Sequence, residues 1–303
     1  MKKAKIKLTP AQIISRALSV IFMTLMFVYC LSLLFPIFWL IINSFKDGLF
    51  EYTQYSTLSF PKKWIVDNYL NVFKNMEYDV YTAAGTIHHT FPLMVLTSLE
   101  YAIGTSIYVA ITLTITAYAI GRYKFWLTKT LYVIGFYMMI IPFTTDGGIS
   151  LLLKKSLGIY DNLWAWILTS GGCIFTGQYF FIMTSLFDKQ GKEYAEAASI
   201  DGANEWQIMT KICIPLAFPM ITVILVLSFI TAWNNYGTFL YYLPSYSNLA
   251  MGMYTFQNMA PIKGKSTPEV LAAFVVVAIP IIVIYIFAQK GIVQNLNIGG
   301  LKG

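Results

Sequence analysis

The sequence predicts an all-α, polytopic membrane protein with six transmembrane helices. The first observation behind this is composition: 57% of the 303 residues are hydrophobic and 12% are charged, about half the charged fraction of a soluble domain. The second is a series of apolar runs long enough to cross a hydrocarbon core roughly 30 Å thick as helices. Helices are favoured over strands because an open sheet cannot satisfy its backbone hydrogen bonds in lipid.

The apolar runs place the spans along almost the whole chain. They are residues 18–42, 96–120, 127–145, 163–186, 214–233 and 270–289. Residues 1–17 are predicted to be a cytoplasmic segment, and residues 18–303 one transmembrane domain. The first run is too long for the apolar part of a signal peptide, and no small-residue cleavage pattern follows it. We therefore expect it to remain as a membrane helix.

The distribution of Lys and Arg predicts the orientation. If the N-terminus is cytoplasmic, the inner segments hold more Lys and Arg than the longer outer segments, as membrane proteins favour. The inner segments are then 1–17, 121–126, 187–213 and 290–303. Both termini are thus expected in the cytoplasm. The net charge of +7 follows from this topology, so nucleic acid need not be a partner, whereas membrane lipid is one.

Signals of catalysis and of metal binding are missing from the sequence. The string GKST at 264–267 resembles the end of a phosphate-binding loop, but Met259 stands where the first glycine is required. His88 and His89 are adjacent, so they cannot share one helical face as metal ligands. Cys30, Cys173 and Cys213 form no CxxC pair. We expect no catalytic residue, no metal and no cofactor in this chain.

Ion coupling within the membrane also finds little support. The candidate carboxylates, Glu100 and Asp146, fall near the outer ends of predicted spans, whereas coupling groups are expected deeper in the membrane. Any transport is therefore expected to draw its energy from a partner.

The inner segment between the fourth and fifth spans is polar and alanine-rich. Tyr194, Ala197 and Ala198 are spaced to form one small apolar helical face. Gly202 is expected to end this helix with a positive φ, and Asn204 to cap a second one. The alternative is an amphipathic connector lying on the membrane surface.

The second short helix leads into the fifth span. Trp206, Met209 and Cys213 recur along it at helical spacing and predict one shared face. Pro215 is expected in the first turn of the span, where proline is tolerated.

This segment resembles the coupling loop of ABC-importer permeases, which follows the pattern E-A-A-x3-G-x9-I-x-L-P. The matching residues are Glu196, Ala197, Ala198, Gly202, Ile212 and Pro215, with Ile214 in place of the usual leucine. The run IDGA, which contains Asp201, resembles the carbohydrate branch. Stretches 117–125, 138–143, 157–168, 233–236 and 299–303 are similar to permeases of the maltose type. Two departures are Asn235 in place of an acid and Thr97 in place of an asparagine.

The resemblance implies a type I ABC-importer permease fold in a bacterial cytoplasmic membrane. It also implies several partner proteins, and a cofactor that the partners bind. The chain would form half of the pathway with a second permease, and two cytoplasmic ATPases would bind the ATP and Mg. An extracytoplasmic solute-binding protein would deliver the cargo. The coupling loop, about 187–215, and the tail 290–303 with Gly300, Lys302 and Gly303 would contact the ATPases.

A carbohydrate path is expected where aromatic rings and amides gather. Its candidate residues are Gln178, Tyr179, Trp233, Asn234, Asn235 and Tyr236. For Tyr241 and Tyr242 a packing or interfacial role is favoured. The outer loop 246–268 is expected to meet the binding protein. Two alternatives remain open: an ABC permease for another solute such as glycerol phosphate, which would favour cations in the cavity, and a secondary transporter.

Overall fold

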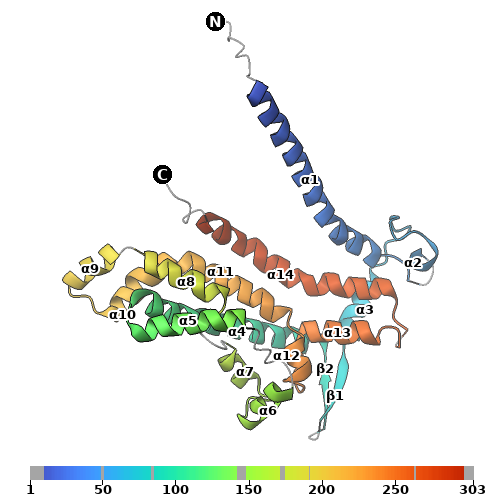
Figure 1. The fold of residues 1–303 in the computed structure, drawn as a ribbon. Helices are drawn as coiled ribbons and strands as arrows, with labels where there is room; N and C mark the ends of the chain where they lie inside the picture. The colour runs from blue at the N-terminus through green and yellow to red at the C-terminus, as the bar shows by residue number, and fades with distance from the viewer. Residues whose placement is uncertain are drawn as a thin grey trace. The chain divides into compact units, whose positions relative to one another are not determined.

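The computed structural model describes residues 10–48, 51–82, 85–141, 148–170, 175–190, 192–262 and 264–296. These residues are mostly helical (Figure 1). The chain divides into two compact units, each taken by itself below. The first comprises Met1–Val72 and Ala260–Val276, and the second Phe73–Met259 and Val277–Gly303.

Four segments among the described residues are long and apolar enough to cross a membrane. They overlap the helices α1 (Pro10–Ser44), α4 (Phe91–Arg122), α11 (Ile214–Trp233) and α14 (Thr267–Leu296). These are the first, second, fifth and sixth predicted spans. Helix α11 has the predicted bounds, whereas the other three continue past them, because a helix does not stop where its apolar run stops. The predicted terminal segments 1–17 and 290–303 are therefore partly helical.

The third and fourth predicted spans are shorter than expected. Helix α5 (Trp126–Ile140) ends before the predicted residue 145, and 142–147, with Asp146, lie outside the described residues. The prediction of one helix over 163–186 was wrong. The structure has α7 (Leu163–Thr169) and α8 (Gln178–Lys189) there. Gly177 precedes α8 with a φ of +93°, a conformation that interrupts a helix and that glycine adopts readily. Cys173 lies outside the described residues.

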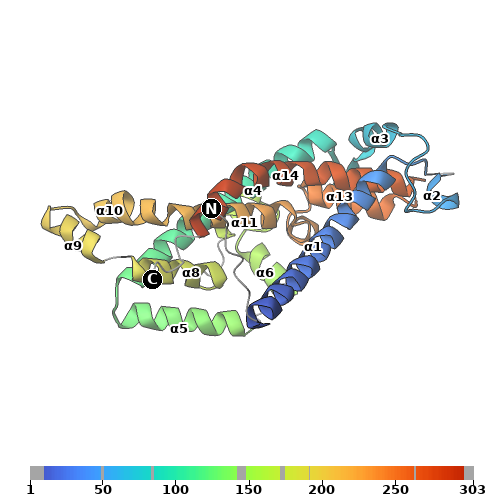
Figure 2. The ribbon, with the colours of Figure 1, turned by 90° about the horizontal axis from the view of Figure 1, so that it is seen from above.

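The core of the second unit forms where α4, α8 and α11 lie side by side, with α5 alongside α8 (Figures 1 and 2). Ala117 and Ala217 are fully buried between them, together with Phe180 and Met183. A Cβ placed on Gly121 would lie 2.8 Å from the carbonyl oxygen of Thr184. Small residues thus let α4 approach its neighbours closely, while the large side chains of α8 fill the remaining volume.

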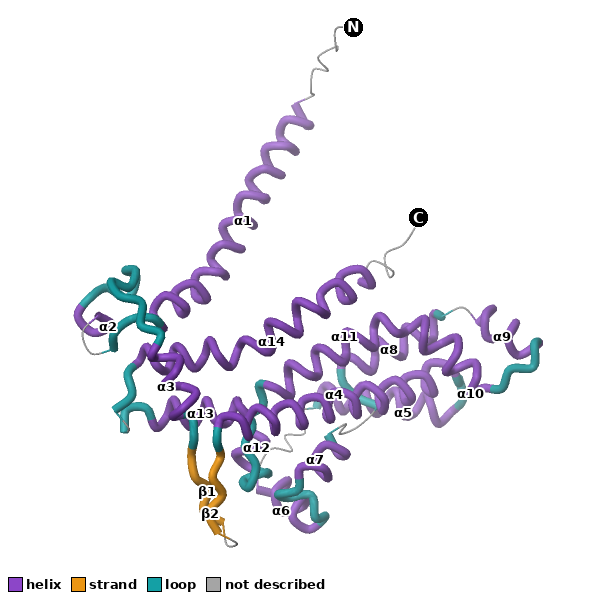
Figure 3. The backbone as a smooth tube through the Cα atoms, turned by 180° about the vertical axis from the view of Figure 1, so that it is seen from behind, coloured by secondary structure: helices purple, strands orange, loops and turns teal. Residues whose placement is uncertain are grey.

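The second unit also contains a hairpin that the all-α prediction missed. Strands β1 (Tyr78–Thr82) and β2 (Gly85–His89) pair antiparallel (Figure 3). Their β-branched and aromatic residues favour strands. His88, exposed on the hairpin, pairs with the carboxylates of Glu77 and Asp79, and His89 is buried.

The same end of the unit carries the short helices α6 (Gly148–Ser156), α12 (Gly237–Tyr241) and α13 (Leu249–Met259). Leu249, Met253 and Phe256 of α13 are buried. A Cβ on Gly252 would lie 2.2 Å from Sδ of Met94, so α13 packs tightly on α4. Much of the predicted outer loop 246–268 is thus a helix whose apolar face belongs to the core, and its contact with a binding protein stays a prediction.

The first unit is organised by a buried polar cluster after α1. It also holds α2 (Glu51–Gln54) and the start of α3 (Asp67–Asn75). The Lys46 side chain is fully buried, and its Nζ donates to the Ser56 carbonyl at 3.2 Å. Asn68 Nδ2 donates to the carbonyl oxygens of Ser44 at 2.8 Å and Lys46 at 3.0 Å. The amide of Asn68 thus holds the chain where it leaves α1.

Asn68→Ala should lower the free energy of unfolding by about 1–3 kcal/mol, because two carbonyl groups lose their donor. The measurement is the thermal unfolding midpoint in detergent, followed by intrinsic fluorescence. Asn258→Ala, at an exposed position on α13, is the matched control and should leave the midpoint unchanged. Equal midpoints for both variants would contradict this role of Asn68.

Candidate functional site

Residues 192–213, named here the α9–α10 segment, lie at one end of the second unit, away from α12 and α13 (Figure 1). Helix α9 (Lys192–Ile200) ends in a Schellman motif. The Ala203 amide donates to the Ala198 carbonyl at 2.9 Å, and the Gly202 amide to the Ser199 carbonyl at 3.1 Å. Gly202 has a φ of +84°, as predicted. A glycine here lets the chain reverse directly after the helix.

The second half of the segment begins with a capping box. Asn204 Oδ1 accepts from the Gln207 amide and Gln207 Oε1 from the Asn204 amide, both at 2.9 Å. This confirms Asn204 as the N-cap of α10 (Glu205–Ile208). A π-helical turn, η1 (Met209–Cys213), then leads into α11, with Pro215 in its first turn as predicted.

One side of the segment belongs to the protein core. Ala195 is 2% exposed, and Ile208, Met209 and Cys213 are buried in the same cluster as residues of α4, α8 and α11. The segment is therefore fixed to the helices that span the membrane by shared apolar packing.

The opposite side is exposed and includes large apolar groups. Tyr194 is 65% exposed, Ile200 87% and Trp206 67%. The predicted shared face is therefore divided: Met209 and Cys213 are buried in the core cluster, whereas Trp206, one turn earlier on α10, is exposed because no neighbouring helix covers it. The predicted alanine face is divided: Tyr194 and Ala197 are exposed, whereas Ala198 is half-buried against the core.

The remaining residues of the predicted coupling loop differ in exposure. Glu196, Asp201, Gly202 and Pro215 are exposed, and Ile212 is half-buried. The tail residues Gly300, Lys302 and Gly303 lie outside the described residues.

Polar contacts that the sequence did not reveal join the segment to its neighbours. Tyr123, just after α4, donates from its hydroxyl to Glu205 Oε2 at 2.9 Å. Burial and this carboxylate raise the pKa of Tyr123, so the phenol keeps its proton and remains a donor. Gln190 Nε2 donates to the Cys213 carbonyl at 3.2 Å. These two hydrogen bonds tie the segment to the end of α4 and to the end of α8.

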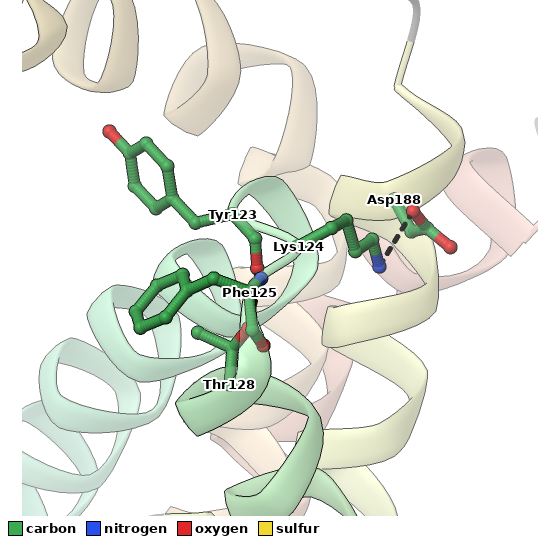
Figure 4. A network of polar contacts seen from close by, with 5 residues as sticks. All are labelled: Tyr123, Lys124, Phe125, Thr128 and Asp188. Carbon is green, nitrogen blue, oxygen red and sulfur yellow. Dashed lines mark hydrogen bonds and ion pairs between the residues drawn. The ribbon is translucent and has the colours of Figure 1, made fainter.

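The turn between α4 and α5 is itself fixed (Figure 4). Thr128 Oγ1 lies 2.7 Å from the Tyr123 carbonyl, to which it donates, and Lys124 Nζ pairs with Asp188 Oδ1 of α8 at 2.9 Å. In the figure the Tyr123 ring points away from the Lys124–Asp188 pair. One short turn thus contacts both α8 and the α9–α10 segment.

The predicted carbohydrate-path residues do not all surround one space. Trp233 is fully buried and stacks on Phe229 with ring centroids 5.7 Å apart. Tyr236 stacks on Tyr254 at 4.7 Å. Asn234 is exposed and bonds back to its own helix, to the Ile230 carbonyl.

Two further candidates lie on α8, and one on α4. Gln178 is exposed at the start of α8, and Tyr179 packs against the core. Glu100 is exposed on α4.

Asn235 does line a cavity, of about 640 Å³, in the second unit near α6, α7 and α12. The other side chains at its wall include Leu151, Trp166, Thr238, Tyr241 and Tyr242. Asn235 also caps the following turn, since its Oδ1 accepts from the Thr238 amide at 3.0 Å. Tyr241 and Tyr242, for which packing was favoured, thus lie at the cavity, and Trp166 was missed. The wall is gathered from segments more than ninety residues apart, from residue 148 to residue 242, which no local pattern reveals.

The aromatic wall is held by stacking and by charge. Trp166 stacks on Tyr242 with centroids 4.8 Å apart, and Lys154 Nζ lies 3.7 Å and 4.0 Å from the two ring centroids. The Asp161 amide donates to the Tyr242 carbonyl at 2.8 Å. The Asp161 carboxylate accepts from the Ser245 amide at 2.9 Å and the Ser245 hydroxyl at 2.6 Å. The cavity can therefore offer flat apolar rings beside an amide and a hydroxyl. Among the described residues no group of three or more His, Cys, Asp or Glu side chains could hold a metal.

Residues 110–297 match a protein family described as "Binding-protein-dependent transport system inner membrane component". The inner membrane ABC transporter permease protein YcjP of Escherichia coli (strain K12) is 28% identical over 89% of this chain and 91% of that protein. The maltodextrin transport system permease protein MdxG of Bacillus subtilis (strain 168) is 25% identical over 97% of this chain and 98% of its own length.

Among solved structures, the chain is similar to one from a bacterial ABC transporter involved in the import of the acidic polysaccharide alginate. The TM-score is 0.71 at 22% identity, over 94% of this chain and 99% of that chain. The likeness extends over nearly the whole length of both chains and identifies the fold as that of an ABC-importer permease.

Asp161→Ala should lower the free energy of unfolding by about 1–2 kcal/mol and loosen the Tyr242 wall. Asp161 has a φ of +57°, which alanine disfavours, and its carboxylate holds Ser245. Asp161→Asn, which tolerates this backbone and keeps one acceptor oxygen, should lose less. The unfolding midpoint and limited proteolysis of 242–248 give the readout, and equal loss in both variants would refute the assignment.

Proposed function

The chain belongs to the family of binding-protein-dependent transport system inner membrane components, and on that premise we propose that it is the permease subunit of an ATP-driven carbohydrate importer. It forms half of the pathway in a bacterial cytoplasmic membrane, beside a second, different permease. Two ATPase subunits bind ATP and Mg, and this chain carries out no reaction and binds no cofactor. An extracytoplasmic binding protein delivers the solute.

Coupling to the ATPase is supported by how the α9–α10 segment is built. Its exposed side presents Glu196, Ala197, Asp201 and Gly202, while its other side lies in the core of the spanning helices. A displacement imposed on the exposed side therefore moves α4, α8 and α11 with it, because a close-packed core transmits strain. This shared core is the observation that carries the proposal.

The chemistry of the exposed side suits a protein partner. Large apolar groups, Tyr194, Ile200 and Trp206, are exposed on the segment, as is the small Ala197. Exposed apolar surface of this kind is typical of interaction sites. Glu196 supplies a carboxylate for a charge-assisted hydrogen bond with a basic group of the ATPase. The tail residues Gly300, Lys302 and Gly303 are proposed to add to the same interface.

The orientation proposed from Lys and Arg places the α9–α10 segment and both termini in the cytoplasm. The hairpin, α12, α13 and the aromatic cavity then face outward, where the binding protein meets the permease. The exposed residues of α13, such as Tyr254 and Gln257, belong to the predicted outer loop 246–268 and are proposed to meet the binding protein.

A carbohydrate of oligosaccharide size is favoured by the relatives and by the cavity. One relative is described as a maltodextrin permease. The cavity combines Trp166, Tyr241 and Tyr242 with the amide of Asn235 and the hydroxyl of Thr238, which suits the apolar faces and hydroxyl groups of a sugar. Family membership removes the alternative of a secondary transporter. The other predicted path residues do not line this cavity and are not proposed to contact the sugar; they are Gln178, Tyr179, Trp233, Asn234 and Tyr236.

Coupling is tested at Gly202 with a matched pair of variants. No atom lies within 4 Å of a Cβ placed there, so a substitution is disfavoured by the backbone angle alone. Gly202→Val should be strained by about 1–2 kcal/mol, whereas Gly202→Asn tolerates positive φ. We expect Val, but not Asn, to weaken ATPase co-purification and to abolish uptake. Similar uptake for both variants would argue against a precise coupling turn.

Glu196→Lys should reverse the charge offered to the ATPase and reduce its retention on the purified complex. Expression of this subunit should stay normal, since Glu196 is exposed outside the spans. A compensating charge reversal on the ATPase that restores uptake would support direct contact. If Glu196→Lys retains the ATPase and imports at the wild-type rate, the coupling surface lies elsewhere.

The aromatic cavity is tested at Tyr241, an exposed residue of its wall. Tyr241→Ala should reduce uptake of labelled oligosaccharides several-fold while the complex still assembles, because the ring carries no buried packing. Tyr285→Ala, at an exposed tyrosine on α14, is the control. Unchanged uptake for Tyr241→Ala across a panel of sugars would remove the cavity from the pathway.

A further inference from the structure

A second cavity, of about 520 Å³, lies at the α9–α10 end of the second unit, where α4, α5 and α8 meet. Its polar lining includes Lys124, Thr128, Lys129, Tyr132, Thr184 and Asp188. No part of the proposed transport mechanism uses it. We propose that this cavity binds a phosphate group, carried by an anionic phospholipid or by a small soluble phosphate ester.

The charges at the cavity favour an anion. Lys124 and Asp188 neutralise one another in an ion pair at 2.9 Å (Figure 4). Lys129 then remains as the excess charge, and among the described residues no carboxylate lies within ion-pair distance of it. Lys129 belongs to the first turn of α5, where the positive end of the helix dipole disfavours a cation. A bound anion would interact favourably with the Lys129 ammonium group and with the positive end of the α5 dipole.

A buried hydroxyl provides an independent indication. Thr184 is 4% exposed and lines the cavity, yet its Oγ1 has no hydrogen-bond partner among the described residues. A buried polar atom without a partner is costly. A phosphate oxygen in the cavity would satisfy it.

The start of α5 lies beside the cavity, since Thr128 and Lys129 of its first turn line the wall. The side chain of Phe125, at the N-cap, cannot accept a hydrogen bond, and the Phe125 amide donates to Thr128 Oγ1 at 3.2 Å. A helix N-terminus next to a lysine is a common setting for phosphate. The cavity volume is also within the range of about 300–1,000 Å³ usual for small-molecule sites.

The surroundings provide a place for an acyl chain. Val133 lies at the cavity wall, and Tyr137 and Ile140 continue the same face of α5, spaced at four and then three residues. All three are about half exposed or more. A phospholipid could therefore place its headgroup in the cavity and one chain along this stripe. With the proposed orientation the site faces the cytoplasmic leaflet, in which basic pockets between helices bind anionic headgroups.

The test uses the assembled importer in nanodiscs that contain equal amounts of phosphatidylglycerol and phosphatidylcholine with the same chains. Lipid retained after extraction is counted by native mass spectrometry, without ATP or binding protein. The wild type should retain phosphatidylglycerol preferentially. Lys129→Gln should reduce this preference about tenfold, because a charged hydrogen bond is lost. Lys189→Gln, at an exposed lysine of α8 outside the cavity, should leave it unchanged.

A second variant and a soluble probe complete the design. Thr184→Val keeps the side-chain shape and should also lower phosphatidylglycerol retention. Because the two variants alter different side chains, a loss in both is not explained by misfolding of Lys129→Gln alone. If glycerol 3-phosphate displaces the lipid and its binding depends on Lys129, the site holds a soluble ester. Equal retention of both lipids, or equal phosphatidylglycerol retention in wild type and both cavity variants, overturns the proposal. Because no sugar or ATP is present, these outcomes are independent of the proposed carbohydrate transport.

Discussion

The structure depends above all on the apolar packing that α4, α8, α11 and the α9–α10 segment share. Ala117 and Ala217 bring the long helices together, and Phe180 and Met183 fill the space between them. Ala195, Ile208 and Met209 extend the same core beyond the spans. A polar segment that would otherwise be a flexible connector is thereby part of one packed body. The cost of separating it is the cost of exposing a core, so the segment and the helices move together.

Much of this arrangement could be predicted from the sequence where a local rule applies. The bounds of α11, the positive φ of Gly202 and the cap at Asn204 follow from apolar length, glycine and capping chemistry. Each of these is decided within a few residues. Family resemblance then supplied the fold that these local features share.

Other features could not be predicted because they depend on contacts between distant residues. The break between α7 and α8 and the hairpin arise inside segments whose composition suits a span or a loop. The aromatic cavity joins Trp166 to Tyr242, and the second cavity joins Lys129 to Thr184. Trp206 shares helical spacing with Met209 and Cys213, but the helices packed against the segment cover Met209 and Cys213 and leave Trp206 exposed. The cavities and this burial pattern are set by packing between distant segments, so no short stretch of sequence contains them.

The π-turn at Met209–Cys213 has a consequence for how such a chain tolerates insertions and deletions. A turn that closes on the fifth residue contains one residue more than an α-turn, as the Ile214 amide bonded to the Met209 carbonyl shows. The wide turn takes up this extra residue locally, so a chain that lacks one residue there can close a regular α-turn with Trp206, Gly202 and Glu196 still pointing in about the same direction. A second deletion would have no wide turn to absorb it and would rotate the segment before α11 by about 100° around the helix axis. The stretch between Asn204 and Pro215 can therefore lose one residue, but not two, without a change in the direction of the projecting surface.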